Sequence, residues 1–321
     1  MMRRSRCHLV VSRLPPPDAS VANLSALQLL LSKGRLQRIP LAAEHVLCQT
    51  FGVDPQHQSW PLAPVSLLGD GVEPAASAWM RVDPVHYRLQ RDSFLLDLPR
   101  PPLTDDDAQQ LVGALNRHFE GRGMLFVAPH PQRWYVRIDQ APALKTVPLS
   151  QALGNDVDAC APQGQDAALW RSLINEAQML LHEHPVNLRR EASGRLPVNS
   201  LWPDGGGRLP PRLKRRFDLV WSDGALARGL ARLSGVECRS AAAFLSEDGE
   251  VENPLLAPEV KDWAQLESDY LLPLLRGLCF GRWGLLTLDF GGRGAVLHCE
   301  IRRRDLLKFW RRSVRPERYL D

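Results

Sequence analysis

The chain has 321 residues, of which 44% are hydrophobic and 24% charged, so it has globular composition and enough apolar material for one or two cores. The formal net charge of +4 tolerates an anionic partner but does not require nucleic acid. None of the six cysteines forms a C-x-x-C pair, which argues against a zinc ribbon or a redox motif. Unpaired cysteines suit a reducing cytoplasm, and no apolar run is long enough to span a bilayer, so we expect a cytoplasmic protein without a membrane partner.

The N-terminal part is predicted to contain one strand and two helices. The strand covers Cys7 to Leu14 and ends at three prolines, and we interpret the basic start as leading into this strand and not as a signal peptide. The helices are predicted at 22–32 and 41–51. The segment 56–73 is rich in proline and glycine and is predicted to be a connection, in which Asp70 belongs to an Asp-Gly turn and not to a metal site.

The middle of the chain alternates between strands and helices. Thr104 precedes three aspartates, which is typical of a helix N-terminus, and that helix is predicted to end near Gly121. Strands are predicted on both sides of it, at 79–89, 94–98, 124–128 and 134–138. This order predicts the α+β class, with a mixed sheet and helices packed on it.

The last third is predicted to end in a β-hairpin and a short helix. Before them we expect a strand at 217–221, a helix at 225–233, and a helix at 263–277 that Pro273 ends or kinks. The hairpin pairs 285–290 with 295–301 over Gly291 and Gly292. The basic C-terminal helix is predicted to turn Leu306, Leu307 and Trp310 inward.

The central stretch 175–207 combines an apolar helical stripe, a helix stop and a dense run of polar side chains. Pro185 lacks an N–H and disfavours the α conformation at His184, so the helix should end there. An irregular segment should follow and run into glycines that allow close approach of a ligand or of backbone. This segment is either a binding loop or a hydrogen-bonded structural loop. Its candidate ligand-binding residues are His184, Asn187, Arg190, Asn199, Trp202, Gly205 and Gly207.

The same run carries a family resemblance. It is similar to a motif of the archaeal-type cofactor-independent phosphoglycerate mutases, at His184, Pro185, Val186, Asn187, Arg190, Gly194, Pro197, Asn199, Trp202, Gly205 and Gly207. With the segment Trp79-Met80-Arg81-Val82-Asp83-Pro84-Val85-His86, the chain more closely resembles the RpfE-type regulatory proteins. The resemblance to the mutase covers roughly 79–235, whereas that to the RpfE type extends over the full length.

The resemblance to the mutase implies a set of catalytic residues that is not found in the C-terminal part of the sequence. A mutase of this type needs two divalent metals and a nucleophilic serine, with several Asp and His ligands. The segment from Val236 to Asp321 contains one histidine, His298, within a predicted strand. His182 and His184 are two residues apart and do not face each other on a helix. We therefore expect no metal, no cofactor and no catalytic residue.

The resemblance to the mutase also implies a site that binds an anion, and such binding does not require catalysis. Arg81, Arg137 and Arg190 stand at positions that resemble arginines of the mutase, and the planar arginine fork suits carboxylate or phosphate. The alternative is that they pair with Asp83, Asp139 and Glu191 and have a structural role.

The expected organisation is an N-terminal segment at 1–75, a mutase-like α+β core at 76–235 and a C-terminal part at 236–321. The preferred hypothesis is a regulatory pseudoenzyme that binds a small phosphorylated or carboxylate ligand. This hypothesis also allows a protein partner. One alternative is an active metal-dependent phosphoglycerate mutase. The other is a nucleic-acid or protein-docking module that uses the basic tail Arg302-Arg303-Arg304 and Arg311-Arg312, although the small net charge argues against nucleic acid.

Overall fold

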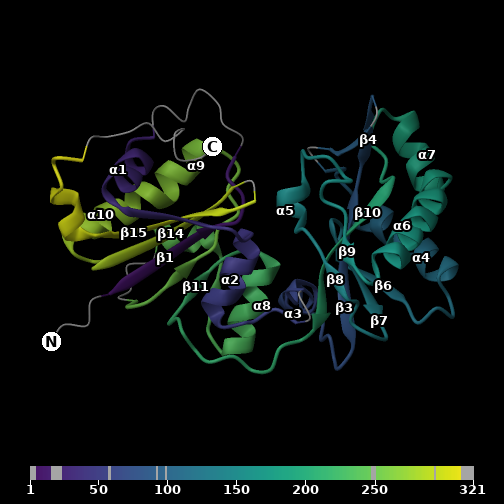
Figure 1. Cartoon of the computed structure of the whole chain (residues 1–321), viewed down its shortest axis with the longest axis horizontal. Coiled ribbons are helices and arrows are strands. Elements are labelled where there is room, and N and C mark those ends of the chain that lie inside the picture. The colour runs from purple at the N-terminus through teal and green to yellow at the C-terminus, as the bar shows by residue number, and fades with distance from the viewer. Residues whose placement is uncertain are drawn as a thin grey trace. The chain divides into compact units, whose positions relative to one another are not determined.

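The computed structural model of the chain describes residues 5–15, 24–56, 59–91, 93–97, 100–246, 251–292 and 294–311 (Figure 1). The chain divides into two compact units. Unit 1 joins residues 1–52 to 212–321, and unit 2 is residues 53–211. This division differs from the three expected segments, because strands near the N-terminus pair with strands near the C-terminus and the middle of the chain forms a unit of its own.

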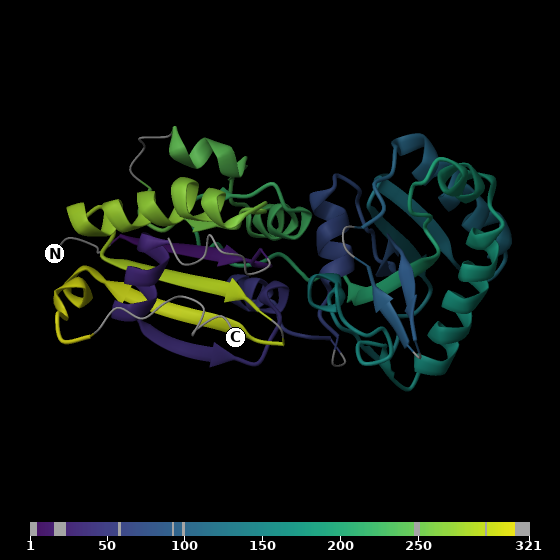
Figure 2. The same cartoon turned by 90° about the horizontal axis from the view of Figure 1, so that it is seen from above.

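Unit 1 is built on a seven-stranded mixed sheet in the order β12-β11-β13-β1-β14-β15-β2. The first five strands in this order run parallel, and β15 and β2 are antiparallel to their neighbours. Figure 2 shows β1 beside β14, followed by β15 and β2. The bounds are β1 (Arg6–Val11), β2 (Arg35–Ile39), β11 (Val220–Trp221), β12 (Cys238–Arg239), β13 (Leu255–Leu256), β14 (Leu285–Gly291) and β15 (Val296–Arg302).

The main core of unit 1 lies on one face of this sheet. Alternate residues of β1 and β14, such as Leu9 and Leu288, pack there against α1 (Ser25–Lys33) and α10 (Leu272–Phe280). On the other face, α2 (Ala43–Phe51) packs against β1, β14 and α8 (Ala225–Ser234). Short helical turns η2 (Ala241–Leu245) and η4 (Arg303–Leu307) complete the unit.

The helix that leads to α10 passes Pro273 without a break. It begins as α9 (Trp263–Gln265), continues as the π-helical segment η3 (Leu266–Leu271) and becomes α10, in whose first turn Pro273 lies. Pro273 directly follows the π-helical segment, where the regular i→i−4 hydrogen-bond ladder is already interrupted, so a residue without an N–H is tolerated there. The buried carboxylate of Glu267 in η3 accepts the backbone N–H groups of Ala26 and Leu27, at 2.5 and 3.2 Å, and so caps the start of α1.

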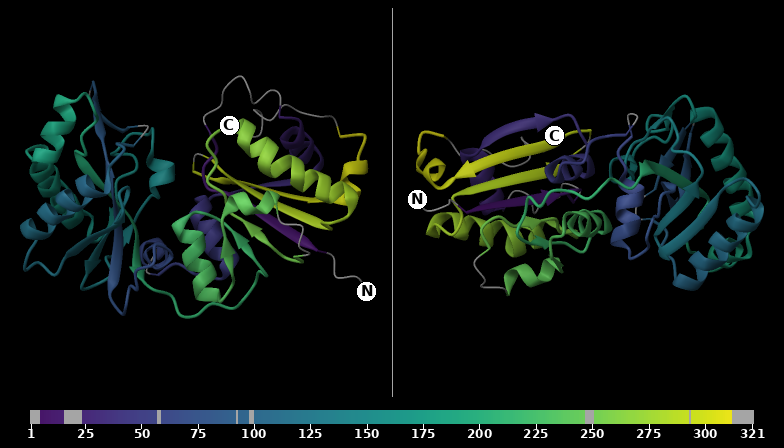
Figure 3. Two further views of the ribbon diagram at one scale, coloured as in Figure 1. Left: turned by 180° about the vertical axis from the view of Figure 1, so that it is seen from behind. Right: turned by 90° about the horizontal axis from the view of Figure 1, so that it is seen from below.

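Unit 2 contains a four-stranded antiparallel sheet in the order β10-β3-β7-β6. Its strands are β3 (Ala78–Val85), β6 (Leu125–His130), β7 (Arg133–Ile138) and β10 (Ser200–Arg208). Helices α4 (Asp105–His118), α6 (Ala167–His182) and α7 (Pro185–Ala192) contribute to the core on one face, and α3 (Leu62–Gly69) packs on the other. Figure 3 shows this unit from behind and from below. The smaller elements are β4 (Tyr87–Gln90), β5 (Ser93–Leu96), β8 (Leu144–Lys145), α5 (Leu149–Ala152) and β9 (Gln163–Gly164).

The predicted α+β class, with a mixed sheet covered by helices and a C-terminal hairpin, is confirmed. Residues 22–23, Leu98 and Arg312 of the predicted elements lie outside the described residues. The expected connection at 56–73 contains α3, whose residues are nearly all buried, so no polar face marks it as a helix in the sequence. Among the described helices, none is both long and apolar enough to cross a membrane.

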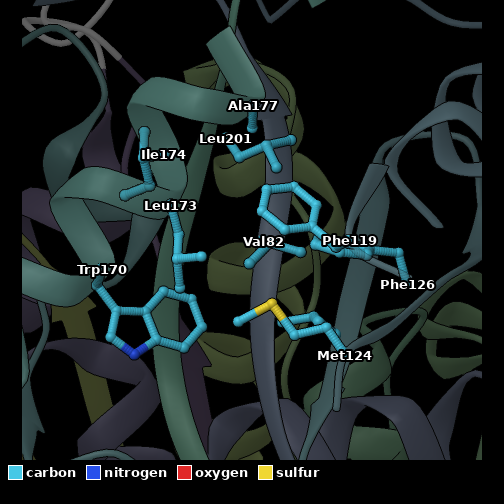
Figure 4. A pocket seen from close by; sticks show the side chains of 10 residues that line it. Val82, Phe119, Met124, Phe126, Trp170, Leu173, Ile174, Ala177 and Leu201 are labelled. Atoms are coloured by element: carbon cyan, nitrogen blue, oxygen red, sulfur yellow. The ribbon is translucent and has the colours of Figure 1, made fainter. Parts of the chain in front are cut away.

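A small apolar void lies between α6 and the sheet of unit 2. Figure 4 shows Trp170, Leu173 and Ala177 of α6 facing Val82 and Phe126 of the sheet. The void has a volume of about 20 Å³, which accommodates about one water-sized sphere, and its lining is apolar. It is therefore a packing imperfection of the core and not a ligand cavity.

Substitution by alanine is expected to have opposite effects on stability at two glycines of unit 2. Gly194 follows α7 with φ +70° and has open space around it, so Gly194→Ala should destabilise the protein through backbone strain alone, by about 1–2 kcal/mol. Gly113 lies inside α4, where an added Cβ would meet only Arg117 at an ordinary 3.5 Å. Gly113→Ala should therefore stabilise the protein by about 0.5–1 kcal/mol. Urea unfolding of both variants checks this, and changes of the same sign would contradict it.

Candidate anion-binding site

The sheet of unit 2 has one apolar face and one charged face. Met80 and Val82 of β3 point to the face covered by α4 and α6. Because side chains alternate along a strand, Arg81 and Asp83 point to the opposite face, where Trp79 packs against α3. The candidate Arg81 therefore lies on the same face of the sheet as Trp79 and Asp83.

Arg81 is held between two buried carboxylates. Its Nη2 lies 3.0 Å from Oδ2 of Asp204 on β10, and its Nε lies 3.4 Å from Oδ2 of Asp83. The Arg81 side chain is 14% exposed, whereas those of Asp83 and Asp204 are 3% and 0% exposed. The expected pairing with Asp83 is therefore present, and Asp204 is a partner that sequence spacing did not reveal.

A second ion pair lies on the same face. Arg133 of β7 makes a bidentate contact with Asp70, at 2.9 and 2.8 Å, and the Tyr135 hydroxyl donates to the same carboxylate at 2.8 Å. Burial raises the pKa of Tyr135 well above its usual value of 10, and the charge of Asp70 adds to that rise. Asp70 follows the last residue of α3, so the predicted turn position also carries an ion pair.

Arg137 completes the charged face. In the antiparallel register Tyr135 lies opposite Arg81, so Arg137 is the diagonal neighbour of Arg81, at about 7–8 Å. Arg137 is exposed, and Arg100 reaches Asp83 from outside the sheet at 3.2 Å. We call Arg81, Arg100, Arg133, Arg137, Asp70, Asp83 and Asp204 the arginine–aspartate face. Its four guanidinium groups and three carboxylates leave a formal charge of +1.

Arg190 lies apart from this face. It belongs to α7, where its Nε donates to the Leu196 carbonyl at 2.9 Å and its Nη1 lies 3.4 Å from Oδ2 of Asp107 on α4. Because α4 covers the apolar face of the sheet, the structure brings Arg81 and Arg137 together but does not add Arg190 to them. The expected pairing of Arg190 with Glu191 is replaced by the contact with Asp107.

The predicted irregular loop after Pro185 is instead regular structure. Proline is favoured in the first turn of a helix, so Pro185 ends α6 at His182 and also starts α7. The His184 ring caps α7 by accepting the N–H of Val186 at 3.2 Å, and burial lowers the pKa of His184 below 6.5, with Arg117 and Arg189 adding to that effect.

The two candidate asparagines make hydrogen bonds to backbone. Asn187 is 1% exposed, donates to the carbonyls of Leu181 and Val198 at 2.7 Å each, and accepts from the Val198 N–H at 2.9 Å. Asn199 accepts from the Tyr87 N–H at 2.7 Å and donates to the Tyr87 carbonyl at 2.9 Å. Both side chains therefore connect segments of unit 2.

Trp202 and the candidate glycines are also packed within the unit. Trp202 is buried, and its Nε1 donates to the Val147 carbonyl at 2.9 Å. A Cβ on Gly205 would stand 2.4 Å from Cβ of Leu62 in α3, and one on Gly207 would meet Pro61 at 3.1 Å. The close approach that these glycines permit is therefore used by α3 and the residue before it.

A cluster of titratable groups in unit 1 escaped the sequence analysis. Asp289 of β14 is buried, and its two carboxylate oxygens each lie 2.6 Å from a histidine nitrogen, Nε2 of His8 on β1 and Nδ1 of His298 on β15. His8 and His298 lie almost 300 residues apart in sequence, and the parallel pairing of β1 with β14 brings them to one carboxylate. The alternation of the C-terminal hairpin places Asp289 opposite His298, but only the parallel pairing reveals His8.

The His8–Asp289–His298 cluster should make stability depend on pH. The hydrogen bond to Asp289 raises the pKa of His298 above 6.5 against the opposing effect of burial. The resulting stabilisation is fully present below pH 6.5 and is lost as the pH rises through the folded-state pKa. Burial acts to raise the pKa of Asp289, but the hydrogen bonds from His298 and His8 outweigh it and the pKa is lowered below 3.8. The contribution of Asp289 is present above pH 3.8 and is lost as the pH falls through its folded-state pKa.

We therefore expect stability from this cluster to be highest between about pH 4 and 6.5. Urea midpoints of the wild type and of His298→Gln, measured from pH 5 to 9, check this. The wild type should lose part of its excess stability over the variant above pH 6.5, and a difference that is independent of pH would contradict the assignment.

In the part of the chain that the structure describes, the donor groups do not match a two-metal centre. Within the described ranges, no group of three or more His, Cys, Asp or Glu side chains is arranged to hold a metal ion. In the His8–Asp289–His298 cluster, both oxygens of Asp289 already accept from imidazole nitrogens.

Comparison with known proteins places a phosphoglycerate-mutase-like region in this chain. Residues 40–187 match the family model of the 2,3-bisphosphoglycerate-independent phosphoglycerate mutases. A protein of that name from Methanosarcina acetivorans is 25% identical over 238 residues, which is 72% of this chain and 57% of the relative. A probable mutase of the same kind from Geobacter sulfurreducens is 25% identical over 291 residues, 84% of this chain and 65% of the relative. The alignments thus span between about half and two thirds of the length of these curated relatives.

Two solved structures are also similar to the chain. A cofactor-independent phosphoglycerate mutase from Thermoplasma acidophilum is 16% identical with a TM-score of 0.42, over 93% of this chain and 90% of that one. A protein of Pyrococcus horikoshii is 15% identical with a TM-score of 0.48, over 94% and 88% of the two chains.

Proposed function

We propose that this chain is a regulatory protein of the RpfE type that binds a small phosphorylated or carboxylate ligand without interconverting phosphoglycerates. Its phosphoglycerate-mutase-like region supports the class of ligand, since the relatives are named for an enzyme of phosphorylated three-carbon acids. The arginine–aspartate face of unit 2 is the proposed site, with Arg137 as the residue that meets the ligand.

The observation that carries this proposal is the position of Arg137 beside Arg81. Three of the four arginines on the face have carboxylate partners at 3.4 Å or less, while Arg137 is exposed on the same face. The carboxylates offset the repulsion that adjacent guanidinium groups would otherwise suffer. An anion would neutralise the remaining charge of +1, and the planar fork of Arg137 suits bidentate contact with phosphate or carboxylate.

The expectation of no turnover comes from the donor groups. The resemblance to the mutase implies two metals held by several aspartates and histidines, but 236–321 contains a single histidine, His298, and that ring is bonded to Asp289. The alternative function is an active mutase, which the names of the curated relatives favour.

Two measurements on the full chain separate these functions. The first is an assay for interconversion of 2- and 3-phosphoglycerate with magnesium or manganese, for which we expect no rate above a chelated control. Turnover that chelation abolishes would overturn the regulatory proposal and favour the enzyme.

The second measurement is the melting temperature with 3-phosphoglycerate and with sulfate. A ligand that binds only the folded state stabilises it by about 2.7 kcal/mol at 100 times its Kd, so the melting temperature should rise. Arg137→Ala should abolish the rise and leave the unliganded melting temperature nearly unchanged, because the side chain is exposed. Arg171→Ala, an exposed arginine on α6, is the matched control and should keep the rise. Equal shifts in both variants, or no shift in the wild type, would reject the site.

A further inference from the structure

The C-terminal segment presents apolar side chains to solvent. The expected helix with Leu306, Leu307 and Trp310 inward is wrong in two of its three contacts: only Leu306 packs against the core. The segment is the 3₁₀ turn η4 followed by a turn at Phe309 and Trp310, and Leu307, Phe309 and Trp310 are 75%, 87% and 66% exposed.

The exposed side chains are presented by an anchored segment. Lys33, at the end of α1, is largely buried, and its ammonium donates to the carbonyls of Lys308 at 2.7 Å and Arg311 at 2.5 Å. In return the Arg311 guanidinium donates to the carbonyls of Lys33 and Gly34, at 3.3 and 2.7 Å. These four hydrogen bonds fix 308–311 against the end of α1, so the apolar side chains have a defined position.

The backbone of the segment is also largely satisfied from within. The N–H groups of Lys308, Phe309 and Arg311 donate to the carbonyls of Asp305, Leu307 and Lys308. Backbone groups that enter the apolar part of a bilayer must have such internal partners. A segment of this kind can approach lipid without leaving these backbone donors unpaired.

The surroundings are positively charged. Arg302, Arg303 and Arg304 are exposed directly before the apolar residues, and the carboxylate of Asp305 is paired with Lys308 at 2.7 Å. Arg303 also lies beside the glycine that ends α10, since its Nη1 is 3.4 Å from the position of a Gly281 Cβ. Three arginines thus precede an apolar tip, and Asp305, the acid between them in the sequence, is paired.

We propose that the turn formed by Leu307, Phe309 and Trp310 inserts into the surface of an anionic phospholipid bilayer, with Arg302, Arg303 and Arg304 at the headgroups. Apolar and aromatic side chains next to arginines are the combination that binds the interface of anionic membranes. Single-stranded nucleic acid fits less well. The Phe309 and Trp310 rings are perpendicular, at 83°, so they do not form one stacking platform, and Leu307 offers no ring to a base.

The test is sedimentation of the full chain with phosphatidylcholine vesicles that contain or lack phosphatidylglycerol. The wild type should bind the anionic vesicles and not the neutral ones, and added salt should weaken binding because it screens the arginines. Phe309→Ala with Trp310→Ala should lower the affinity by about tenfold or more, since bound apolar area is lost. Charge reversal with Arg303→Glu and Arg304→Glu should abolish binding.

The matched control is Phe94→Ala, which removes an aromatic side chain that is 47% exposed on unit 2 and should leave vesicle binding unchanged. Unchanged melting temperatures of all variants would show that the folded state is intact. The proposal is overturned if the wild type does not bind anionic vesicles or if the double alanine variant binds like the wild type. Binding of a single-stranded oligonucleotide in place of vesicles would assign the surface to nucleic acid. The charge-reversal variant leaves the ligand site on unit 2 unaltered, so its loss of vesicle binding does not depend on whether the proposed ligand site is right.

Discussion

Asp289→Ala is expected to lower the free energy of unfolding by about 3–5 kcal/mol, because it removes the common partner of two histidines from a buried position. The Asp289 side chain is 1% exposed, and those of His8 and His298 are 15% and 22% exposed. Without the carboxylate, the His298 ring must lose its proton or keep an uncompensated charge in a partly desolvated site, and Nε2 of His8 loses its hydrogen-bond partner. Urea unfolding near pH 6, where both interactions contribute, measures the loss.

Glu300→Gln is the control for this variant. Its carboxylate is 4.0 Å from Nε2 of His298 and 42% exposed, so an interaction of at most about 1 kcal/mol is expected. The loss in Asp289→Ala should also diminish as the pH rises through the raised folded-state pKa of His298, where the wild type gives up that proton as well. A loss of less than about 1 kcal/mol for Asp289→Ala at pH 6 would contradict the role given to the Asp289 carboxylate, since a loss of that size is typical of an exposed ion pair.

Elements whose signals are local could be predicted from the sequence. Thr104 caps α4 by accepting the N–H of Asp107, as the three aspartates after it indicate, and α8 ends at Gly235, which has φ +65°. The C-terminal hairpin was predictable because Gly291 and Gly292 separate two apolar strands. Each of these elements depends on interactions between residues that are close in the sequence.

The sheet order of unit 1 depends on distant pairing and was not predictable in the same way. The strand β1 pairs in parallel with β14, about 280 residues later, and β2 pairs with β15. No local pattern specifies such a register, so the expected boundary at residue 75 falls inside unit 2 and the one at residue 235 falls inside unit 1. The contact of His8 with Asp289 depends on this pairing.

The candidate site shows the same limit. The alternation in Trp79-Met80-Arg81-Val82-Asp83 indicates that Arg81 and Asp83 share a face, and both belong to the arginine–aspartate face. That Arg137 also lies on this face follows from the register between β3 and β7, which the sequence does not specify. Arg190 was grouped with them by resemblance alone, and Pro185 was interpreted as a helix stop although it also favours a helix start.

Asn187→Ala is expected to cost about 3–5 kcal/mol of stability, which would separate a structural role from a ligand-binding one. The side chain satisfies the Leu181 carbonyl at the end of α6 and both backbone groups of Val198 before β10, and removing it leaves buried polar groups without these partners. Each such group costs about 1–3 kcal/mol.

Asn199→Ala is the matched comparison, because this side chain also bonds both backbone groups of one residue, Tyr87, but is only partly buried. Water can replace part of what is lost there, so a smaller cost of about 1–2 kcal/mol is expected. Urea unfolding gives both values, and the melting shift with 3-phosphoglycerate tests the remaining function of each folded variant. If Asn187 contacted the ligand, Asn187→Ala would remove the ligand shift and leave the unliganded stability near that of the wild type. The three hydrogen bonds of Asn187 to backbone predict the reverse: a large loss of stability, with the ligand shift retained because Arg137 remains in place.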